Sequence, residues 1–137
     1  MKYKQTYIPS VTIKERTYLR KYVSRYYTEH IQGKTIKNKH TGLTIYFGAD
    51  GKSKLAAGGS MYAKKAALVQ CLPELLEHAT YSNFGHRKPT DEPNVFGFAN
   101  FKAKVYIDGK LEHAHIAVTV KTNGKAYYSH EINTIKK

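Results

Sequence analysis

Residues 99–121 read ANFKAKVYIDGKLEHAHIAVTVK, a stretch in which apolar and polar side chains alternate on both sides of Asp108-Gly109. Alternation at this period is typical of a β-strand with one buried face, because successive side chains point to opposite faces of a sheet. Asp-Gly between two such runs favours a two-residue hairpin turn. The stretch therefore predicts an antiparallel hairpin of two long strands, at 95–107 and 111–121.

The chain continues with a second turn of the same kind at Asn123-Gly124 and a third expected strand at 125–132. Together the strands predict an antiparallel meander with one apolar and one polar face. The apolar face carries Ala99, Phe101, Ala103, Val105, Ile107, Ala114, Ile116, Val118 and Val120. The polar face carries Asn100, Lys102, Lys104, Tyr106, His113, His115, Ala117, Thr119 and Lys121.

Residues 61–79 give the clearest helical pattern, since alanine, valine and leucine recur through them. Pro73 cannot continue a straight helix without the loss of a backbone hydrogen bond, whereas Glu74 suits the first turn of a new one. We expect a break near Leu72 and a second short helix that begins with Pro73. This second helix, at 72–79, is expected to pack on the apolar face of the meander.

The N-terminal half predicts one more helix and two short strands. The helix is expected at 12–31, and Gly33 ends it. The strands are expected at 35–36 and 43–47, and residues 81–94 are expected to form a polar loop. The apolar stripe of the helix consists of Leu19, Tyr22, Val23, Tyr26 and His30.

These elements predict an α+β fold: a basic N-terminal helix and a central kinked helix pair, packed on a C-terminal antiparallel β-meander. The length of 137 residues suits a single domain. Within it, residues 1–33 form a basic, tyrosine-rich helical arm and residues 34–137 the α+β core.

Positive charge is concentrated at the N-terminal end of the chain. The formal net charge is +13, and residues 1–40 hold ten lysines and arginines against two acids, together with six of the 12 tyrosines. Basic side chains interleaved with aromatic rings favour a nucleic-acid partner, which offers phosphates and bases for stacking. The alternatives are a solvated basic face and, with less support, an anionic membrane surface.

The polar face of the meander is the candidate site. Histidine titrates near neutral pH, so a pair of histidines can move the two protons that RNA cleavage requires, while a lysine stabilises the phosphate. His115 is the first choice for proton transfer. The full catalytic set is expected to comprise His115, His113, Lys104, Tyr106, Tyr128 and His130. The alternative is a polar sheet face that is exposed to solvent and has no catalytic role.

Phosphate contacts are expected from basic residues in three places. They are Lys14, Arg20, Lys21 and Arg25 on the N-terminal helix, Lys102 on the sheet face, and Arg87 and Lys88 in the 81–94 loop. Removal of the helix cations is expected to weaken binding uniformly across sequences, since phosphate contacts carry little sequence information.

Neither a metal nor another cofactor is predicted. His113 and His115 share a strand face, but the sequence places no carboxylate to complete a metal site. Cys71 lies in an apolar helical stretch, and burial there disfavours a nucleophilic thiolate. No secretory signal or membrane-spanning run is found, so a cytoplasmic location is expected.

Several motifs together resemble a family of phage and mobile-element domains. They are Gly33-Lys-Thr-Ile36, Leu72-Pro-Glu-Leu-Leu-Glu-His-Ala79, Phe98-Ala-Asn-Phe101, Val105-Tyr-Ile-Asp-Gly-Lys110 and Gly124-Lys-Ala-Tyr-Tyr128. The chain between residues 33 and 134 is similar to the large polyvalent-protein-associated domains of the barnase/EndoU/colicin/RelE-like (BECR) nuclease group. This resemblance implies a small α+β fold that cleaves RNA on an open sheet face without a metal. The basic N-terminal helix lies outside it.

Two functions follow as hypotheses. The first is a metal-independent, BECR-like endoribonuclease or toxin-like relative that acts on RNA, with an antitoxin as a partner. The second is a non-catalytic nucleic-acid-binding regulator or inhibitor that occupies a nucleic-acid groove of a host nucleoprotein complex. An interaction protein whose charge is incidental is a third class. Cleavage in EDTA separates the first from the others, and salt-dependent binding separates the second from the third.

Overall fold

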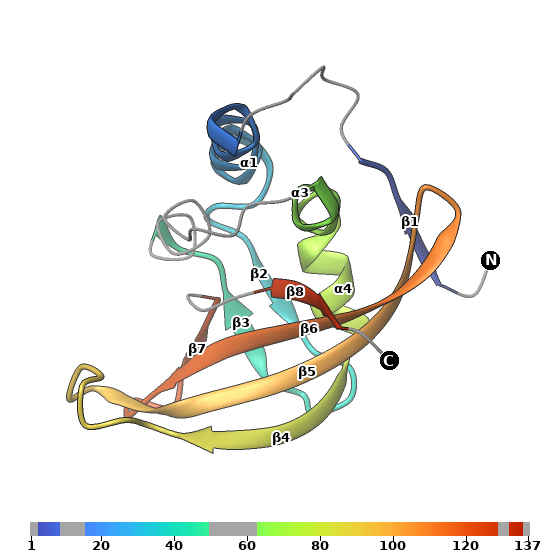
Figure 1. Cartoon of the computed structure of the whole chain (residues 1–137). Coiled ribbons are helices and arrows are strands. Elements are labelled where there is room, and N and C mark those ends of the chain that lie inside the picture. Colours follow the sequence, from blue (N-terminus) through green and yellow to red (C-terminus); the bar gives the residue numbers. More distant parts are fainter. Residues whose placement is uncertain (1–2, 9–15, 50–62, 129–131, 136–137) are drawn as a thin grey trace.

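The computed structural model of the chain describes residues 3–8, 16–49, 63–128 and 132–135. Its architecture is α+β, as the sequence predicts. Figure 1 shows a curled sheet whose inner face carries the helices α3 (Ala63–Val69) and α4 (Leu72–His78), with α1 (Arg16–His30) lying above α3. The chain therefore stacks a sheet, a helix pair and an outer helix.

The centre of the sheet is the predicted hairpin. Strands β5 (Val95–Ile107) and β6 (Lys110–Lys121) pair antiparallel over nearly their whole lengths. Asp108 and Gly109 connect them with φ angles of 49° and 81°, the left-handed values that this turn requires. Burial alternates along β5, as the predicted faces require, whereas residues 116–119 of β6 are all buried, so Ala117 and Thr119 of the predicted polar face are covered.

Shorter strands extend the hairpin on both sides, in the order β1-β5-β6-β7-β3-β2. On one side of β5, β1 (Lys4–Thr6) pairs in parallel and β4 (Thr80–His86) pairs antiparallel. On the other side, β6 pairs with β7 (Ala126–Tyr127) and with β8 (Ile132–Ile135). β3 (Thr44–Tyr46) joins β7, and β2 (Thr35–Lys37) joins β3, where short strands are predicted.

Two predictions about the strands are wrong. Residues 80–86 form β4 rather than the start of a loop, because β5 offers an edge to which this polar segment bonds. Its Phe84 ring packs so closely on Gly97 of β5 that an added Cβ there would clash with the ring. Of the third strand expected at 125–132, only residues 126–127 form β7, and a separate strand, β8, begins at Ile132 and pairs with a different part of β6.

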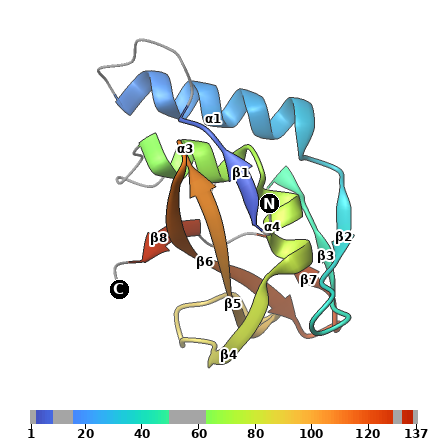
Figure 2. The same cartoon turned by 90° about the vertical axis from the view of Figure 1, so that its right-hand side faces the viewer.

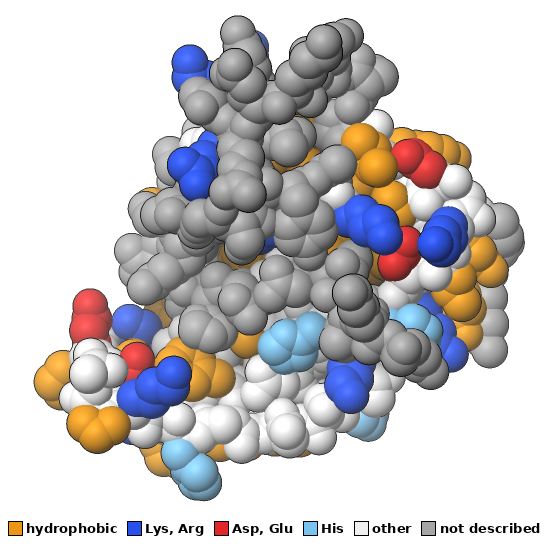
Figure 3. Space-filling view, in the orientation of Figure 1, with side chains coloured by type: hydrophobic (Ala, Val, Ile, Leu, Met, Phe, Trp, Pro, Cys, Tyr) orange, Lys and Arg blue, Asp and Glu red, His pale blue; other side chains and the backbone are white. Residues whose placement is uncertain are grey.

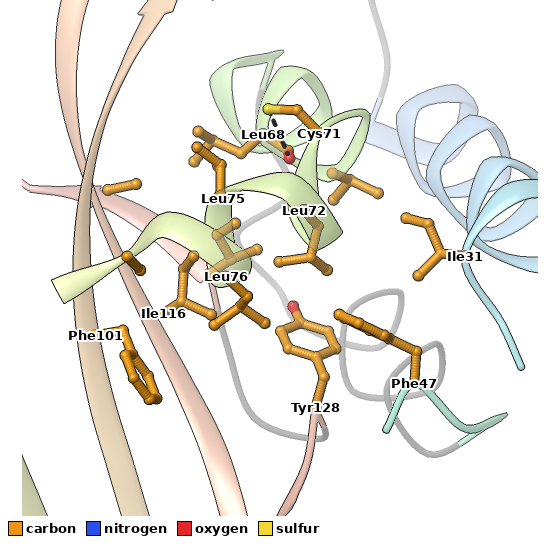
Figure 4. Packing of buried hydrophobic residues seen from close by; sticks show 14 of the residues in the cluster. Ile31, Phe47, Leu68, Cys71, Leu72, Leu75, Leu76, Phe101, Ile116 and Tyr128 are labelled. Atoms are coloured by element: carbon orange, nitrogen blue, oxygen red, sulfur yellow. Dashed lines mark hydrogen bonds between the residues drawn. The ribbon is translucent and has the colours of Figure 1, made fainter. Parts of the chain in front are cut away.

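The helix pair follows the prediction. α3 ends at Val69 and α4 begins at Leu72, with Pro73 in its first turn, where the missing N–H is not needed. Leu72 and Leu76 are fully buried, and Figure 4 shows Leu76 beside Ile116 of β6. The prediction that this helix packs on the apolar face of the meander is confirmed.

Helix α1 buries a stripe that differs from the expected one. Val23, Tyr27 and Ile31 have relative exposures of 0%, 0% and 1%, and the Tyr27 hydroxyl donates to the Gly48 carbonyl at 2.8 Å. Tyr26 is half-buried, while His30 is exposed, so the buried stripe runs one residue later than predicted at its C-terminal end. Tyrosine spacing alone does not distinguish Tyr26 from Tyr27, which follow each other in the chain.

The helices of the described residues include none that is long and apolar enough to cross a membrane.

Candidate nucleic-acid cleft

A cleft opens where one edge of β5 is left uncovered. β1 pairs with residues 105–107 of this edge and β4 with residues 97–102, so Ala103 and Lys104 face a gap between the two strands. Helix α4 lies beside the gap, as the view in Figure 2 shows near the N-terminus. The cleft has a volume of about 920 Å³.

The cleft collects basic side chains from separate parts of the sequence. Its walls include Tyr3 and Lys4 at β1, Glu74 and His78 of α4, Lys102 and Lys104 of β5, and His113 of β6. Three lysines and two histidines thus face one acid, a balance that attracts anions. Figure 3 shows histidine and lysine side chains on the surface that β5 and β6 form.

Register explains why Lys104 and His113 meet. They are direct partners across the β5–β6 ladder, and opposite residues of an antiparallel pair lie on the same face. Glu112, the residue before His113, points to the helix side, where its carboxylate pairs with the Lys64 ammonium at 2.9 Å. The acid nearest to His113 in sequence is therefore engaged on the other face of the sheet.

Two tyrosines border the cleft at β1. The Lys104 ammonium lies 5.7 Å from the centroid of the Tyr3 ring, and the Tyr3 ring lies 6.2 Å from that of Tyr106. Tyr106 is thus next to the cleft without being part of its wall. A cation held over a ring face is attracted by the ring quadrupole, so Tyr3 helps to position Lys104.

His115 lies one step along the same face, opposite Lys102. Its Nε2 is 2.9 Å from Oδ1 of Asn100, a half-buried neighbour on β5. The wall of the cleft is formed by His113 instead. Of the residues predicted for the polar face, the structure therefore brings Lys102, Lys104 and His113 into one cleft, with Tyr106 and His115 beside it.

Tyr128 is not on the polar face. It is fully buried, with its ring 5.9 Å from that of Phe47 and 6.4 Å from that of Tyr27 (Figure 4). Strand alternation accounts for this: Tyr127 lies on the outer face opposite Thr119, so Tyr128 turns inward. The prediction that Tyr128 lies on the polar, catalytic face is therefore wrong. His130, the other residue predicted from this segment, lies outside the described residues.

The basic residues predicted to contact phosphate are spread over different parts of the molecule. Lys21 and Arg25 are exposed on α1, where Arg25 pairs with Glu29 at 2.9 Å, and Arg20 is half-buried; Lys14 lies outside the described residues. The views in Figures 1 and 2 place α1 beyond α3, away from the outer face of the sheet.

The loop after β4 holds the last two predicted phosphate contacts, Arg87 and Lys88. The Arg87 guanidinium donates to the Asp91 carbonyl at 2.9 Å, and the Lys88 backbone N–H donates to the Asp91 carboxylate at 2.7 Å. This loop lies at the end of β5 opposite to β1, so these two residues do not reach the cleft.

Four charged, imidazole or aromatic side chains of the cleft were not predicted as site residues: Tyr3, Lys4, Glu74 and His78. His78 follows an apolar helical pattern, and Lys4 belongs to a strand of three residues. Their meeting depends on two edge strands with weak sequence signals. Of these four residues, only Lys4 was indicated by the sequence, because it belongs to the basic N-terminal segment.

Cys71 is not among the described residues that line the cleft. Burial raises the pKa of the Cys71 thiol to about 12, and its Sγ donates to the Leu68 carbonyl at 3.5 Å. The sequence-based expectation that Cys71 is not a nucleophile agrees with this burial. Across the described ranges, no group of three or more His, Cys, Asp or Glu residues is placed to hold a metal ion.

Comparison with known protein families gives a match. No curated protein and no solved structure matches the chain. The sequence of residues 14–128 matches the large polyvalent protein-associated domain 3, and this range includes α1 as well as the β5–β6 hairpin. The match confirms the resemblance to phage and mobile-element domains of polyvalent proteins. It covers most of the sequence, and the chain therefore belongs to the large polyvalent protein-associated domain 3 family.

Proposed function

We propose that this domain binds RNA in the cleft between β1, α4 and β5 and cleaves it without a metal ion. The observation that supports this is the convergence of Lys4, Lys102 and Lys104 with His78 and His113 in one cleft. Lysines supply the charge that holds a phosphate, and two imidazoles supply an acid and a base that work near neutral pH.

The reaction needs two proton transfers. His113 accepts the proton of the ribose 2′-hydroxyl as the 2′-oxygen attacks phosphorus, and the bond from phosphorus to the 5′-oxygen breaks. A protonated His78 gives its proton to that departing oxygen, which leaves a 2′,3′-cyclic phosphate and a 5′-hydroxyl. Lys102 and Lys104 stabilise the extra negative charge on the phosphoryl oxygens in the transition state.

This assignment moves the main role from His115 to His113. Both histidines lie on the same face of β6, but His113 lines the cleft, whereas His115 is hydrogen-bonded to Asn100 beside it. The two therefore form a matched pair for mutagenesis, since they share a strand, a face and a side-chain type.

The test is cleavage of purified RNA in EDTA. We expect His113→Ala to lower kcat by about 10²–10⁴-fold, the range of a general acid or base, with little change in affinity for a DNA strand of the same sequence. His115→Ala is the control and should stay within a few-fold of the wild type. Lys102→Gln should lower kcat and also weaken binding and flatten its salt dependence.

Two outcomes would refute the catalytic proposal. One is equal activity of the His113→Ala and wild-type proteins. The other is tight, salt-sensitive RNA binding by a wild type that cleaves no RNA, and this result would favour the non-catalytic regulator or inhibitor of a host nucleoprotein complex.

A further inference from the structure

A pair of tyrosines stands on the outer face of the sheet, away from the cleft. Tyr46 of β3 and Tyr127 of β7 are direct partners in a parallel ladder, and their ring centroids lie 5.5 Å apart with an angle of 33° between the planes. Both side chains are half-buried, so part of each ring contacts solvent. Their neighbours Ile45 and Ala126 fill the core and have an exposure of 0%.

Lysines flank the pair. The Lys121 ammonium lies 5.8 Å from the centroid of the Tyr127 ring, and the Lys125 ammonium lies 5.8 Å from that of Tyr46. These distances are near the limit of a cation–π contact, so each lysine can leave the ring and contact a phosphate at a small cost in free energy. Rings with cations at their margins suit a ligand that has both flat bases and phosphates.

The tyrosine pair and one wall of the cleft, formed by Lys104 and His113, lie on the same side of the sheet. Tyr127 lies opposite Thr119 of β6, and Thr119 lies on the same side of that strand as His113, by alternation. Thr119 lies six positions after His113, which corresponds to about 20 Å along the strand. Between them on this side of the strand lie His115, which is half-buried, and Ala117, which has an exposure of only 1%; Thr119 itself is 5% exposed, and neither His115 nor Ala117 is acidic.

We propose that Tyr46 and Tyr127 form a stacking platform for the bases of single-stranded RNA, on the side of the sheet that also carries Lys104 and His113. The inference rests on the proposed RNA-binding function and adds the form of the substrate, a single strand. Bases that are paired in a duplex keep their faces covered by neighbours, so the platform discriminates against double strands. Lys121 and Lys125 contact phosphates on either side of the stacked bases.

The experiment uses a labelled single-stranded DNA oligonucleotide, which lacks the 2′-hydroxyl and is not cleaved, and measures binding by fluorescence anisotropy. Tyr46→Leu and Tyr127→Leu keep apolar bulk but remove the aromatic face, and each should weaken binding by about 5- to 150-fold. Tyr46→Phe and Tyr127→Phe keep the ring and should bind within about two-fold of the wild type. Tyr7→Leu is the control, since Tyr7 is 61% exposed and follows β1.

Salt titration separates stacking from charge. The Leu variants should keep the wild-type salt slope, whereas Lys121→Gln and Lys125→Gln should each reduce it by about 0.7. Binding of a duplex of the same sequence should not change in the Leu variants. Thermal melting of each variant confirms that it is folded, and the Phe variants test the rings independently if a Leu variant is not.

The platform and the cleavage proposal fail in different ways. Unchanged single-strand binding by both Leu variants, or an equal loss of duplex binding, would overturn the platform even if the wild type cleaves RNA. Weakened single-strand binding would support the platform even if the wild type cleaves nothing. A wild type that binds no single strand would overturn the platform as well and would favour a protein ligand for this face.

Discussion

Asn38 ties the end of helix α4 to the β2–β3 connection, and its loss should cost more stability than that of any exposed polar group. Its side chain is fully buried, and its amide nitrogen donates to the carbonyls of Leu76 at 2.6 Å and Ala79 at 2.9 Å. Its amide oxygen accepts from the backbone N–H of Thr41 at 2.9 Å and from the Thr41 hydroxyl at 3.0 Å.

The magnitude follows from the two carbonyls at the C-terminal end of α4. In Asn38→Ala both lose the amide donor in a buried place, and each unsatisfied buried group costs about 1–3 kcal/mol. Thr41 is exposed, so water replaces most of what its groups lose. We therefore expect a loss of about 2–5 kcal/mol, against a total stability of about 5–15 kcal/mol for a domain.

Urea unfolding measures this loss as a shift of the transition midpoint, provided that the m-value is the same in the variant and the wild type. Asn38→Asp keeps the shape but replaces the amide donors by a carboxylate that faces two carbonyls, and it should destabilise at least as much. Thr41→Val, which removes one hydroxyl at the surface, should cost less than about 1 kcal/mol. An Asn38→Ala protein within about 0.5 kcal/mol of the wild type would show that the hydrogen bonds at Asn38 do not hold α4.

Two further predictions concern the core. Leu76→Ala should lower the free energy of unfolding by about 2–5 kcal/mol through a cavity under the sheet, and superimposable urea transitions would contradict the packing of α4. Because burial raises the pKa of the Cys71 thiol to about 12, the native state keeps its proton to higher pH than the unfolded chain, whose thiol titrates near ~8.5. The stability of the wild type should thus fall, relative to Cys71→Ala, by up to about 1.4 kcal/mol per unit as pH rises above that value, and parallel pH profiles would refute this.

The sequence predicts the hairpin and the helix break well because both have local causes. Asp108 and Gly109 suit the left-handed turn by themselves, and the alternation on either side determines which face is buried. Pro73 likewise ends one helix and begins the next through its own missing N–H. Neither depends on what packs against it.

The edge strands have no such local cause. β4 contains serine, asparagine and glycine, which are poor strand formers, and it becomes a strand because β5 supplies partners for its backbone groups. β1 is three residues long and pairs with β5 across about a hundred residues of sequence. Since the cleft is the gap between β1 and β4, the sequence pattern gives its β5 and β6 walls but not its other residues.

The N-terminal charge cluster illustrates the same difference between sequence and space. Counted along the chain, Lys4, Lys21 and Arg25 belong to one basic segment. In the fold, β1 carries Lys4 to the edge of the sheet and into the cleft, while α1 holds Lys21 and Arg25 on the far side of the helix layer. An RNA strand bound as proposed, in the cleft and on the tyrosine pair, would therefore meet Lys4 but neither Lys21 nor Arg25. The charge of α1 acts on such a ligand at long range, where salt screens it, or serves a second contact of its own.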